Sequence, residues 1–221
     1  MDESVKKRSY NSPRRQEQAR ETRKRILEAA QRLFVSEGYV AATLPEVARE
    51  AGVSPATITV AFGTKLALLN ALVRSEVRGD EEPAPVAQRY WWQEMLAEPD
   101  PVRQLTLFAG IAQRIHGRTT DIAEIVRGAA AVDPELAAWR QELGESRLQD
   151  AREVVESLVH KQALAADITV GRAIDLLWTL GSSEFYRTLV VERGWSPEQY
   201  KQSLVSLLVC SLLGHRQSEK S

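Results

Sequence analysis

The sequence predicts an all-α protein of about nine helices, in which a compact three-helix unit and a fourth helix precede a longer helical bundle. Apolar residues recur with a period near 3.6 in most segments, and the alternation typical of β-strands is scarce. Cap residues followed by proline, as in Ser54-Pro55, Asp100-Pro101 and Ser196-Pro197, indicate helix starts. The length of 221 residues allows one or two domains with a substantial core.

The N-terminal end is basic, and residues 1–17 are expected to form a disordered arm. Residues 1–65 hold 12 Lys and Arg against 8 Asp and Glu, whereas the remainder holds 17 against 22. The first helix is expected from about Gln18 to Glu37, with Arg23 among several cations in its first two turns. Cations there oppose the helix dipole, so this charge favours a second role, which is the neutralisation of phosphates on a polyanion.

Two short helices joined by a tight turn follow the first helix. Thr43 and Glu46 have the spacing of a capping box, and Gly52 stands where a helix end needs a left-handed residue. Ser54 can cap the next helix, and Pro55 suits its first position. Two short helices joined in this way form a helix-turn-helix, whose second helix lies in the major groove of DNA.

The domain boundary is expected just after a fourth helix over residues 65–78. The segment 79–85, GDEEPAP, is acidic and interrupted by proline. A DNA-binding domain over residues 18–79 and a C-terminal domain over residues 86–215 are therefore expected. The second domain should hold a short amphipathic piece and five helices, over residues 90–98, 101–117, 121–131, 134–162, 169–193 and 197–213.

Residues 22–73 resemble the DNA-binding domain of the TetR family of transcriptional regulators. The matching pieces are ILxAAxxLF at residues 26–34, Gly38-Tyr39, AxxAGVS at residues 48–54, Thr57-Ile58, FGTK at residues 62–65 and Leu68-Leu69. They cover about a quarter of the chain in the family's order and spacing. The resemblance implies a helix-turn-helix motif at about residues 43–62 and sequence-specific binding to double-stranded DNA.

The resemblance also implies which side chains meet DNA. Thr43 and Lys65 would contact phosphate, and the outward face of the second motif helix would meet bases and backbone. Thr59 and Ala61 depart from the family, which usually has Tyr and His there, and we hypothesise that basic residues before the first helix offset the lost contacts. The expected DNA-binding residues are Arg23, Thr43, Ser54, Pro55, Ala56, Thr57, Thr59, Val60 and Lys65.

In this family the C-terminal bundle encloses a small-molecule site, and its last two helices form a homodimer. The resemblance therefore implies a palindromic operator, an unknown small-molecule effector and a homodimer through residues of about 169–213. A repressor that responds to this effector is the expected function. Candidate pocket residues are bulky or polarisable and lie on expected inward faces, although plain core packing is the competing interpretation for each: Phe108, Ile111, His116, Trp139 and Trp178.

Enzyme chemistry finds no support in the sequence. The three histidines have no Cys or carboxylate partner at a zinc-motif spacing, Gly63-Thr64-Lys65 lacks the upstream glycine of a phosphate loop, and no GxSxG elbow occurs. Neither a metal nor a cofactor is expected. No apolar stretch is long enough for a membrane span, the start lacks a signal peptide, and a single cysteine suits a reducing compartment, so we expect a cytoplasmic protein with no membrane partner.

Two further functions remain open at this point. A helical ligand-binding or interaction protein could carry a degenerate helix-turn-helix, but it would not need the Arg- and Lys-rich start. A DNA-binding protein with a structural role and no effector would have a dry, fully packed bundle core.

Overall fold

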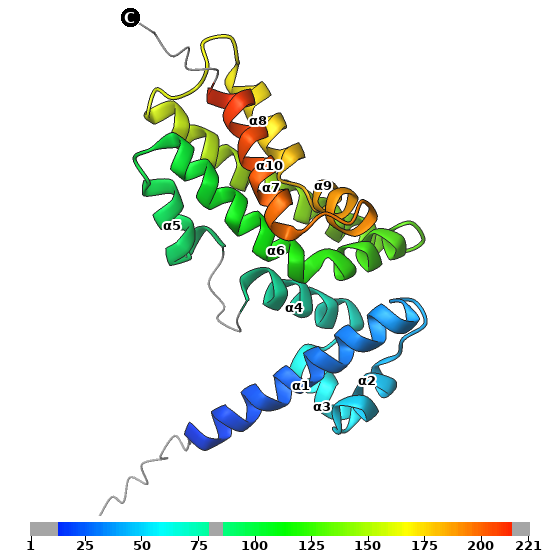
Figure 1. The fold of residues 1–221 in the computed structure, drawn as a ribbon. Coiled ribbons are helices and arrows are strands. Elements are labelled where there is room, and N and C mark those ends of the chain that lie inside the picture. Colours follow the sequence, from blue (N-terminus) through cyan, green and yellow to red (C-terminus); the bar gives the residue numbers. More distant parts are fainter. Residues whose placement is uncertain (1–12, 80–85, 214–221) are drawn as a thin grey trace, which may run out of the picture. The chain divides into compact units, whose positions relative to one another are not determined.

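The computed structural model describes residues 13–79 and 86–213, and this part of the chain is helical without a strand (Figure 1). The expected all-α class is confirmed. Ten α-helices are described, against about nine expected. They are α1 (Pro13–Glu37), α2 (Leu44–Ala51), α3 (Pro55–Phe62), α4 (Lys65–Arg78), α5 (Tyr90–Ala97), α6 (Pro101–Ala130), α7 (Pro134–His160), α8 (Val170–Leu180), α9 (Ser183–Tyr186) and α10 (Pro197–Leu208).

The chain divides into two compact units, residues 1–72 and residues 73–221. The division falls inside α4, whereas we expected it after that helix, at residues 79–85. Leu68, Leu69 and Leu72 of α4 are buried in the first unit. The last turn of α4 belongs to the second unit, where Arg118 of α6 donates to the carbonyl oxygens of Glu76 and Val77 at 2.8 and 3.3 Å. Most of the expected linker, residues 80–85, lies outside the described residues.

The first unit is built as the cap signals predict. The Thr43 hydroxyl accepts the Glu46 N–H, and the Glu46 carboxylate accepts the Thr43 N–H at 2.8 Å, which completes the expected capping box. Gly52 ends α2 in the left-handed region, with φ 66°. Ser54 caps α3, whose Ile58 is fully buried. The core combines this side chain with apolar residues of α1, α2 and α4, among them Ile26, Ala30, Phe34, Val47, Ala48, Leu68 and Leu69.

Helix α1 begins at Pro13, five residues before the expected start. Arg23 and Lys24 therefore lie in the third turn rather than the first two, where the helix dipole has little effect. The dipole argument for a second role of these cations was accordingly wrong, although their exposure on one basic helix still favours an anionic partner. Residues 1–12, the greater part of the expected arm, lie outside the described residues.

Helix α6 is continuous over 30 residues, whereas we expected a break after Gly117. The break signal was misleading because a glycine inside a helix weakens the helix without having to end it. A Cβ atom on Gly117 would lie 3.4 Å from the Tyr186 hydroxyl, which is an ordinary van der Waals distance, so the packing there does not require a glycine. Thr119 and Thr120 stay within the helix by donating to the carbonyls of Ile115 and His116.

The helix expected over residues 169–193 is interrupted after α8. Gly181 ends α8, and Ser182 begins α9 by accepting the Phe185 N–H at 3.1 Å. A wider helical turn, Arg187–Glu192, continues the chain to Arg193. A serine cap directly after a glycine is itself a stop-and-restart signal, which the apolar pattern on both sides obscured.

The second unit has its own core, in which α6 packs against α7 and α10, and α7 packs against α8. Leu204 and Leu208 of α10 are fully buried in it. Among the described residues, no single helix is long and apolar enough to cross a membrane; α3 and α4 together meet that length and composition, but they are bent by 67° and share the first unit's core.

Candidate nucleic-acid interface

Helix α3 is fixed to the first unit from one side only. Ile58 buries its side chain, while Pro55, Ala56, Thr59 and Val60 remain exposed. Val60 is 90% exposed, the largest exposed fraction among the large hydrophobic side chains of the described residues. The short helix thus presents a face of small side chains to its surroundings.

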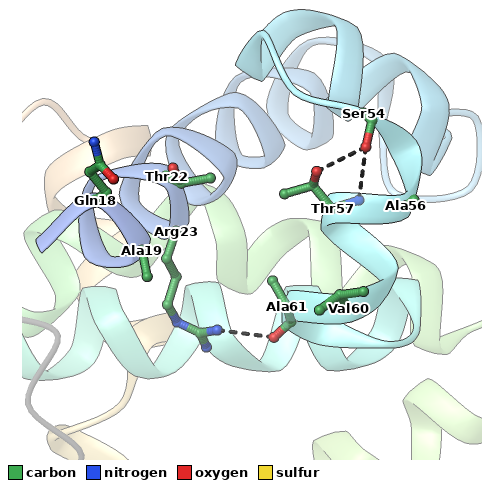
Figure 2. Close-up of a pocket in the computed structure, with 9 residues that line it drawn as sticks. All are labelled: Gln18, Ala19, Thr22, Arg23, Ser54, Ala56, Thr57, Val60 and Ala61. Atoms are coloured by element: carbon green, nitrogen blue, oxygen red, sulfur yellow. Dashed lines mark hydrogen bonds between the residues drawn. The ribbon is translucent and has the colours of Figure 1, made fainter. Parts of the chain in front are cut away.

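A hollow of about 660 Å³ separates this face from the N-terminal half of α1 (Figure 2). The structure brings five of the nine predicted DNA-binding residues to it: Arg23, Ser54, Ala56, Thr57 and Val60. Sequence reasoning missed the other lining residues, Gln18, Ala19, Thr22 and Ala61. Gln18, Ala19 and Thr22 could have been found, because with Arg23 they recur on one face of a helix at spacings of one, three and four.

Arg23 holds α3 against α1. Its guanidinium donates to the Ala61 carbonyl oxygen at 3.2 Å, as Figure 2 shows, and lies 4.2 Å from the centroid of the Phe62 ring. The first contact satisfies a carbonyl in the last turn of α3, and the second is a cation–π interaction. Arg23 therefore positions α3 in this structure, and its predicted contact with DNA stays a prediction.

Thr43 and Lys65 both have partners within the first unit. The Thr43 hydroxyl donates to Glu46 at 2.6 Å, and this bond together with the backbone bond of the capping box lowers the pKa of Glu46. Lys65 donates to the Val40 carbonyl oxygen at 3.3 Å, and its Nζ lies 4.4 Å from the centroid of the Tyr39 ring. Burial lowers the pKa of Lys65, although Glu46 opposes this shift. Pro55 and Thr59 are exposed but do not line the hollow.

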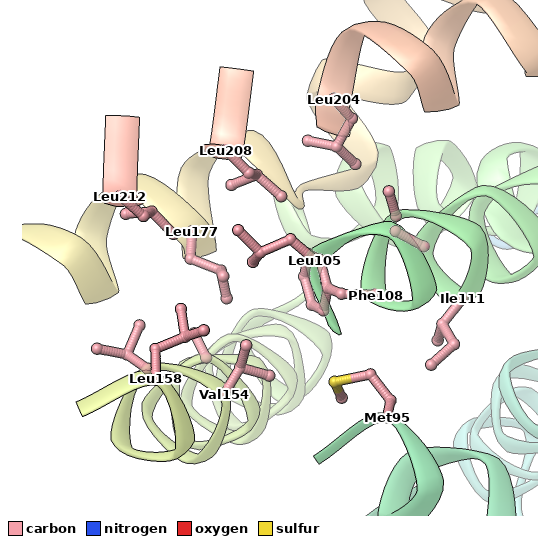
Figure 3. Packing of buried hydrophobic residues seen from close by; sticks show 14 of the residues in the cluster. Met95, Leu105, Phe108, Ile111, Val154, Leu158, Leu177, Leu204, Leu208 and Leu212 are labelled. Atoms are coloured by element: carbon pink, nitrogen blue, oxygen red, sulfur yellow. The ribbon is translucent and has the colours of Figure 1, made fainter. Parts of the chain in front are cut away.

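The predicted effector site lies in the second unit, where Phe108 and Ile111 belong to the buried core (Figure 3). His116 is also buried, and its Nε2 donates to the Gly181 carbonyl oxygen at 3.0 Å. Burial lowers the pKa of His116 to about 4, and the bond to Gly181 opposes the shift only partly. His116 is therefore a neutral imidazole at physiological pH.

An aromatic cluster that sequence reasoning missed adjoins His116. The Tyr186 ring centroid lies 5.8 Å from that of His116 and 4.8 Å from that of Tyr200. The Tyr200 hydroxyl is buried without a hydrogen-bond partner among the described residues, and burial raises its pKa. On α7, burial and the nearby Glu153 raise the pKa of Asp150 to about 6. No spacing signal could have shown that His116, Tyr186 and Tyr200 converge, because they come from separate helices.

Two of the five pocket candidates lie apart from this cluster. Trp139 is buried in α7 but outside the core that holds Phe108 and Ile111. Trp178 is 39% exposed, which contradicts its expected inward position, and Arg147 lies 5.6 Å from its ring centroid. None of the five lines the hollow at α1 and α3 or a second one of about 480 Å³ beside α5 and α7. A pocket among them stays a prediction.

The described residues place no group of three or more His, Cys, Asp or Glu side chains where it could hold a metal ion. What the first unit offers instead is a short exposed helix, a hollow beside it and a basic neighbouring helix. That arrangement suits contact with a grooved polyanion, because it combines a thin protruding element with positive charge.

Comparison with known proteins also indicates that the first unit binds DNA. The family model described as bacterial regulatory proteins, tetR family, matches residues 26–72. The uncharacterized HTH-type transcriptional regulator TtgW of Pseudomonas putida is 36% identical over 88 residues, which are 38% of this chain and 66% of TtgW. The HTH-type transcriptional regulator SrpR of Pseudomonas putida is also 36% identical over 88 residues, which are 41% of SrpR. The chain thus spans less than two thirds of these relatives.

The likeness in fold extends over both units. The crystal structure of NalD, the secondary repressor of the MexAB-OprM multidrug efflux pump in Pseudomonas aeruginosa, matches with a TM-score of 0.68. The match covers 90% of this chain and 99% of NalD at 23% sequence identity. At that identity the comparison establishes the shared fold alone.

Proposed function

The chain belongs to the TetR family of bacterial regulatory proteins, and from this premise we propose that it is a sequence-specific repressor of transcription. It would bind a palindromic operator in double-stranded DNA as a homodimer and leave it when a small-molecule effector binds. The observation that carries the proposal is the exposed face of α3 beside the basic helix α1. A helix of eight residues with small outward side chains can enter the major groove without steric conflict.

Exposed apolar side chains on the later helices support the homodimer. Trp178 of α8 and Leu207 of α10 are 39% and 41% exposed, whereas their neighbours Leu177 and Leu208 are buried. A second copy of the chain would cover such residues across a two-fold axis. Two copies would also present two α3 helices to two half-sites, as a palindrome requires.

Coupling to an effector would run through α4, because this helix belongs to both units. Arg118 of α6 binds the carbonyls of Glu76 and Val77 at its C-terminal end. A ligand that displaces α6 would therefore pull on α4. Coupling free energies between two sites are typically about 1–3 kcal/mol, so the effector should weaken operator affinity by roughly 5–150-fold.

The test is selection of duplexes from a random pool, with the bound species sized. Ala56→Glu places a carboxylate on the exposed face of α3. Val35→Glu, at a 48% exposed position near the end of α1, adds the same charge to the same unit and is the matched control. Enrichment of a palindrome that dimers bind, lost in Ala56→Glu and kept in Val35→Glu, would support the proposal.

Two results would overturn it. Salt-sensitive binding without any enriched sequence would leave only an electrostatic contact with phosphates. Equal loss of binding in both variants would mean that negative charge anywhere on the unit repels DNA, so that α3 has no special role.

A further inference from the structure

We propose that this chain reads its operator mainly through the C5-methyl groups of thymine, and that the half-site beneath α3 is accordingly rich in A·T pairs. The inference rests on the proposed function, since it concerns the bases that the same surface would recognise. It follows from the chemistry of the α3 face and the hollow beside it.

The first observation is what α3 lacks. Its sequence, PATITVAF, contains no Arg, Lys, Asn, Gln, Asp or Glu. Bidentate hydrogen bonds to guanine come from Arg or Lys, and those to adenine come from Asn or Gln, while Asp and Glu accept from cytosine. Helix α3 can make none of these contacts, so the usual direct readout of a G·C pair is closed to it.

The second observation is how its hydroxyl groups are used. The Thr57 hydroxyl lies 2.9 Å from that of Ser54, within hydrogen-bond distance, and the Ser54 hydroxyl also accepts the Thr57 N–H at 3.2 Å. The Thr59 hydroxyl donates to the Pro55 carbonyl oxygen at 3.3 Å. The hydroxyl groups of Ser54, Thr57 and Thr59 therefore already have partners within α3 and its cap, and each of the two threonines also carries a methyl group.

The third observation is the apolar lining of the hollow. Val60, Ala56 and Ala61 of α3 and Ala19 of α1 surround it with methyl groups (Figure 2). Val60 is 90% exposed, so its contact with a base would bury apolar surface that the folded chain leaves in water. Ala and the methyl of Thr are the side chains that contact the thymine methyl in the major groove.

The two long polar residues of the hollow agree with this reading. The Arg23 guanidinium is engaged by the Ala61 carbonyl and the Phe62 ring. Gln18 is the single amide among the nine lining residues. An amide pairs best with adenine, which is the partner of thymine, so Gln18 favours the same base pair.

Charge complementarity identifies the occupant as DNA rather than an apolar peptide. Arg20 and Lys24 are exposed on α1, with side-chain exposures of 73% and 62%, and each lies 4.0 Å from a glutamate of the same helix. The excess of positive charge remains, because residues 1–65 hold 12 Lys and Arg against 8 Asp and Glu. Phosphates along the groove edge would meet this charge while the methyl groups meet the bases. Backbone contacts would thus position the chain, and methyl contacts would supply specificity.

The experiment starts from the selected operator and replaces each thymine of one half-site by uracil in turn. Uracil keeps every hydrogen-bonding group and lacks only the methyl, so the change isolates the apolar contact. One buried methyl group should be worth about fourfold in affinity. We expect at least one uracil substitution per half-site to weaken binding by about this factor, measured by fluorescence anisotropy at fixed salt.

Matched protein variants identify the contacting side chain. Thr57→Val keeps the methyl and removes the hydroxyl, whereas Thr57→Ser keeps the hydroxyl and removes the methyl. If methyl contacts supply specificity, the first binds within about twofold of wild type and the second loses about fourfold. Val60→Ala should lose affinity for the thymine duplex but not for the matching uracil duplex, and Val35→Ala, at an exposed position away from the hollow, should change neither.

The outcomes separate this inference from the proposed function. A selected operator whose affinity changes less than twofold with uracil at every position would overturn the methyl readout and leave the repressor proposal intact. A half-site dominated by G·C pairs, or a Thr57→Val variant weaker than Thr57→Ser, would do the same. Failure to select any sequence would instead overturn the proposed function itself.

Discussion

Replacing Gly181 by alanine should destabilise the second unit, because the space for a Cβ atom is already filled. An added Cβ would lie 2.9 Å from the Leu177 carbonyl oxygen and 2.9 Å from Cζ of Phe108. Both distances are shorter than real Cβ contacts allow, so the backbone or the Phe108 ring must move. The φ angle of −80° is ordinary for alanine, so overpacking is the cause and the left-handed region plays no part.

Overpacking of a well-packed core costs about 1–3 kcal/mol of unfolding free energy. Phe108 is buried in the core of the second unit, and the Gly181 carbonyl accepts from His116, so a shift on either side disturbs further contacts. For a domain of about 150–250 residues, each kcal/mol of lost unfolding free energy corresponds to a fall in Tm of about 2–4 °C. The assay is urea denaturation followed by circular dichroism, at one protein concentration because dimerisation would make stability depend on it.

Gly144→Ala is the matched control for this prediction. Gly144 lies within α7, and an added Cβ there would meet nothing within 4 Å. Alanine in a helix interior is more stable than glycine by about 0.5–1 kcal/mol, so this variant should unfold at higher urea than wild type. A Gly181→Ala variant that unfolds at the wild-type midpoint would refute the reasoning, and so would a loss of equal size in both variants.

Two further predictions concern the cap of α2 and two titratable groups, the buried His116 and the half-buried Asp150. Thr43→Ala removes one half of the capping box and should lower the unfolding free energy by about 1 kcal/mol in urea denaturation; no change would contradict the cap's contribution. The pKa of His116 is lowered to about 4, so acidification from pH 6 to pH 4 protonates this group more in the unfolded chain and lowers the unfolding free energy. The pKa of Asp150 is raised to about 6, so the same acidification protonates it more in the folded chain and raises the unfolding free energy. Unfolding free energy should therefore fall more steeply in Asp150→Asn than in wild type over this range, and less steeply in His116→Asn; parallel curves would contradict both assignments.

Local chemistry made much of the fold predictable. The capping box at Thr43, the left-handed Gly52 and the caps at Asp100 and Ser196 all form as the sequence indicates. Each depends on residues within a few positions of one another, so no knowledge of distant contacts is needed. The helix-turn-helix is predictable for the same reason.

The errors arose where distant contacts override a local signal. Gly117 indicates a helix end, but α6 continues through it and packs there against α9, whose Tyr186 is 69 positions away in the chain. Trp178 follows an apolar pattern that predicts an inward face, yet it is 39% exposed. Spacing within one helix could not reveal which of its faces a neighbouring helix would cover.

The sequence alone therefore determined the helical class and the two helices of the motif, because these follow from capping chemistry and apolar periodicity over short distances. Only the tertiary structure decided that Arg23 holds α3 by its last turn, that α1 and α3 share one hollow, and that His116 adjoins Tyr186. These are contacts between helices, and they depend on how apolar faces are buried against each other. Which faces pack together depends on the packing of the whole unit, so the periodicity of any one segment does not indicate it.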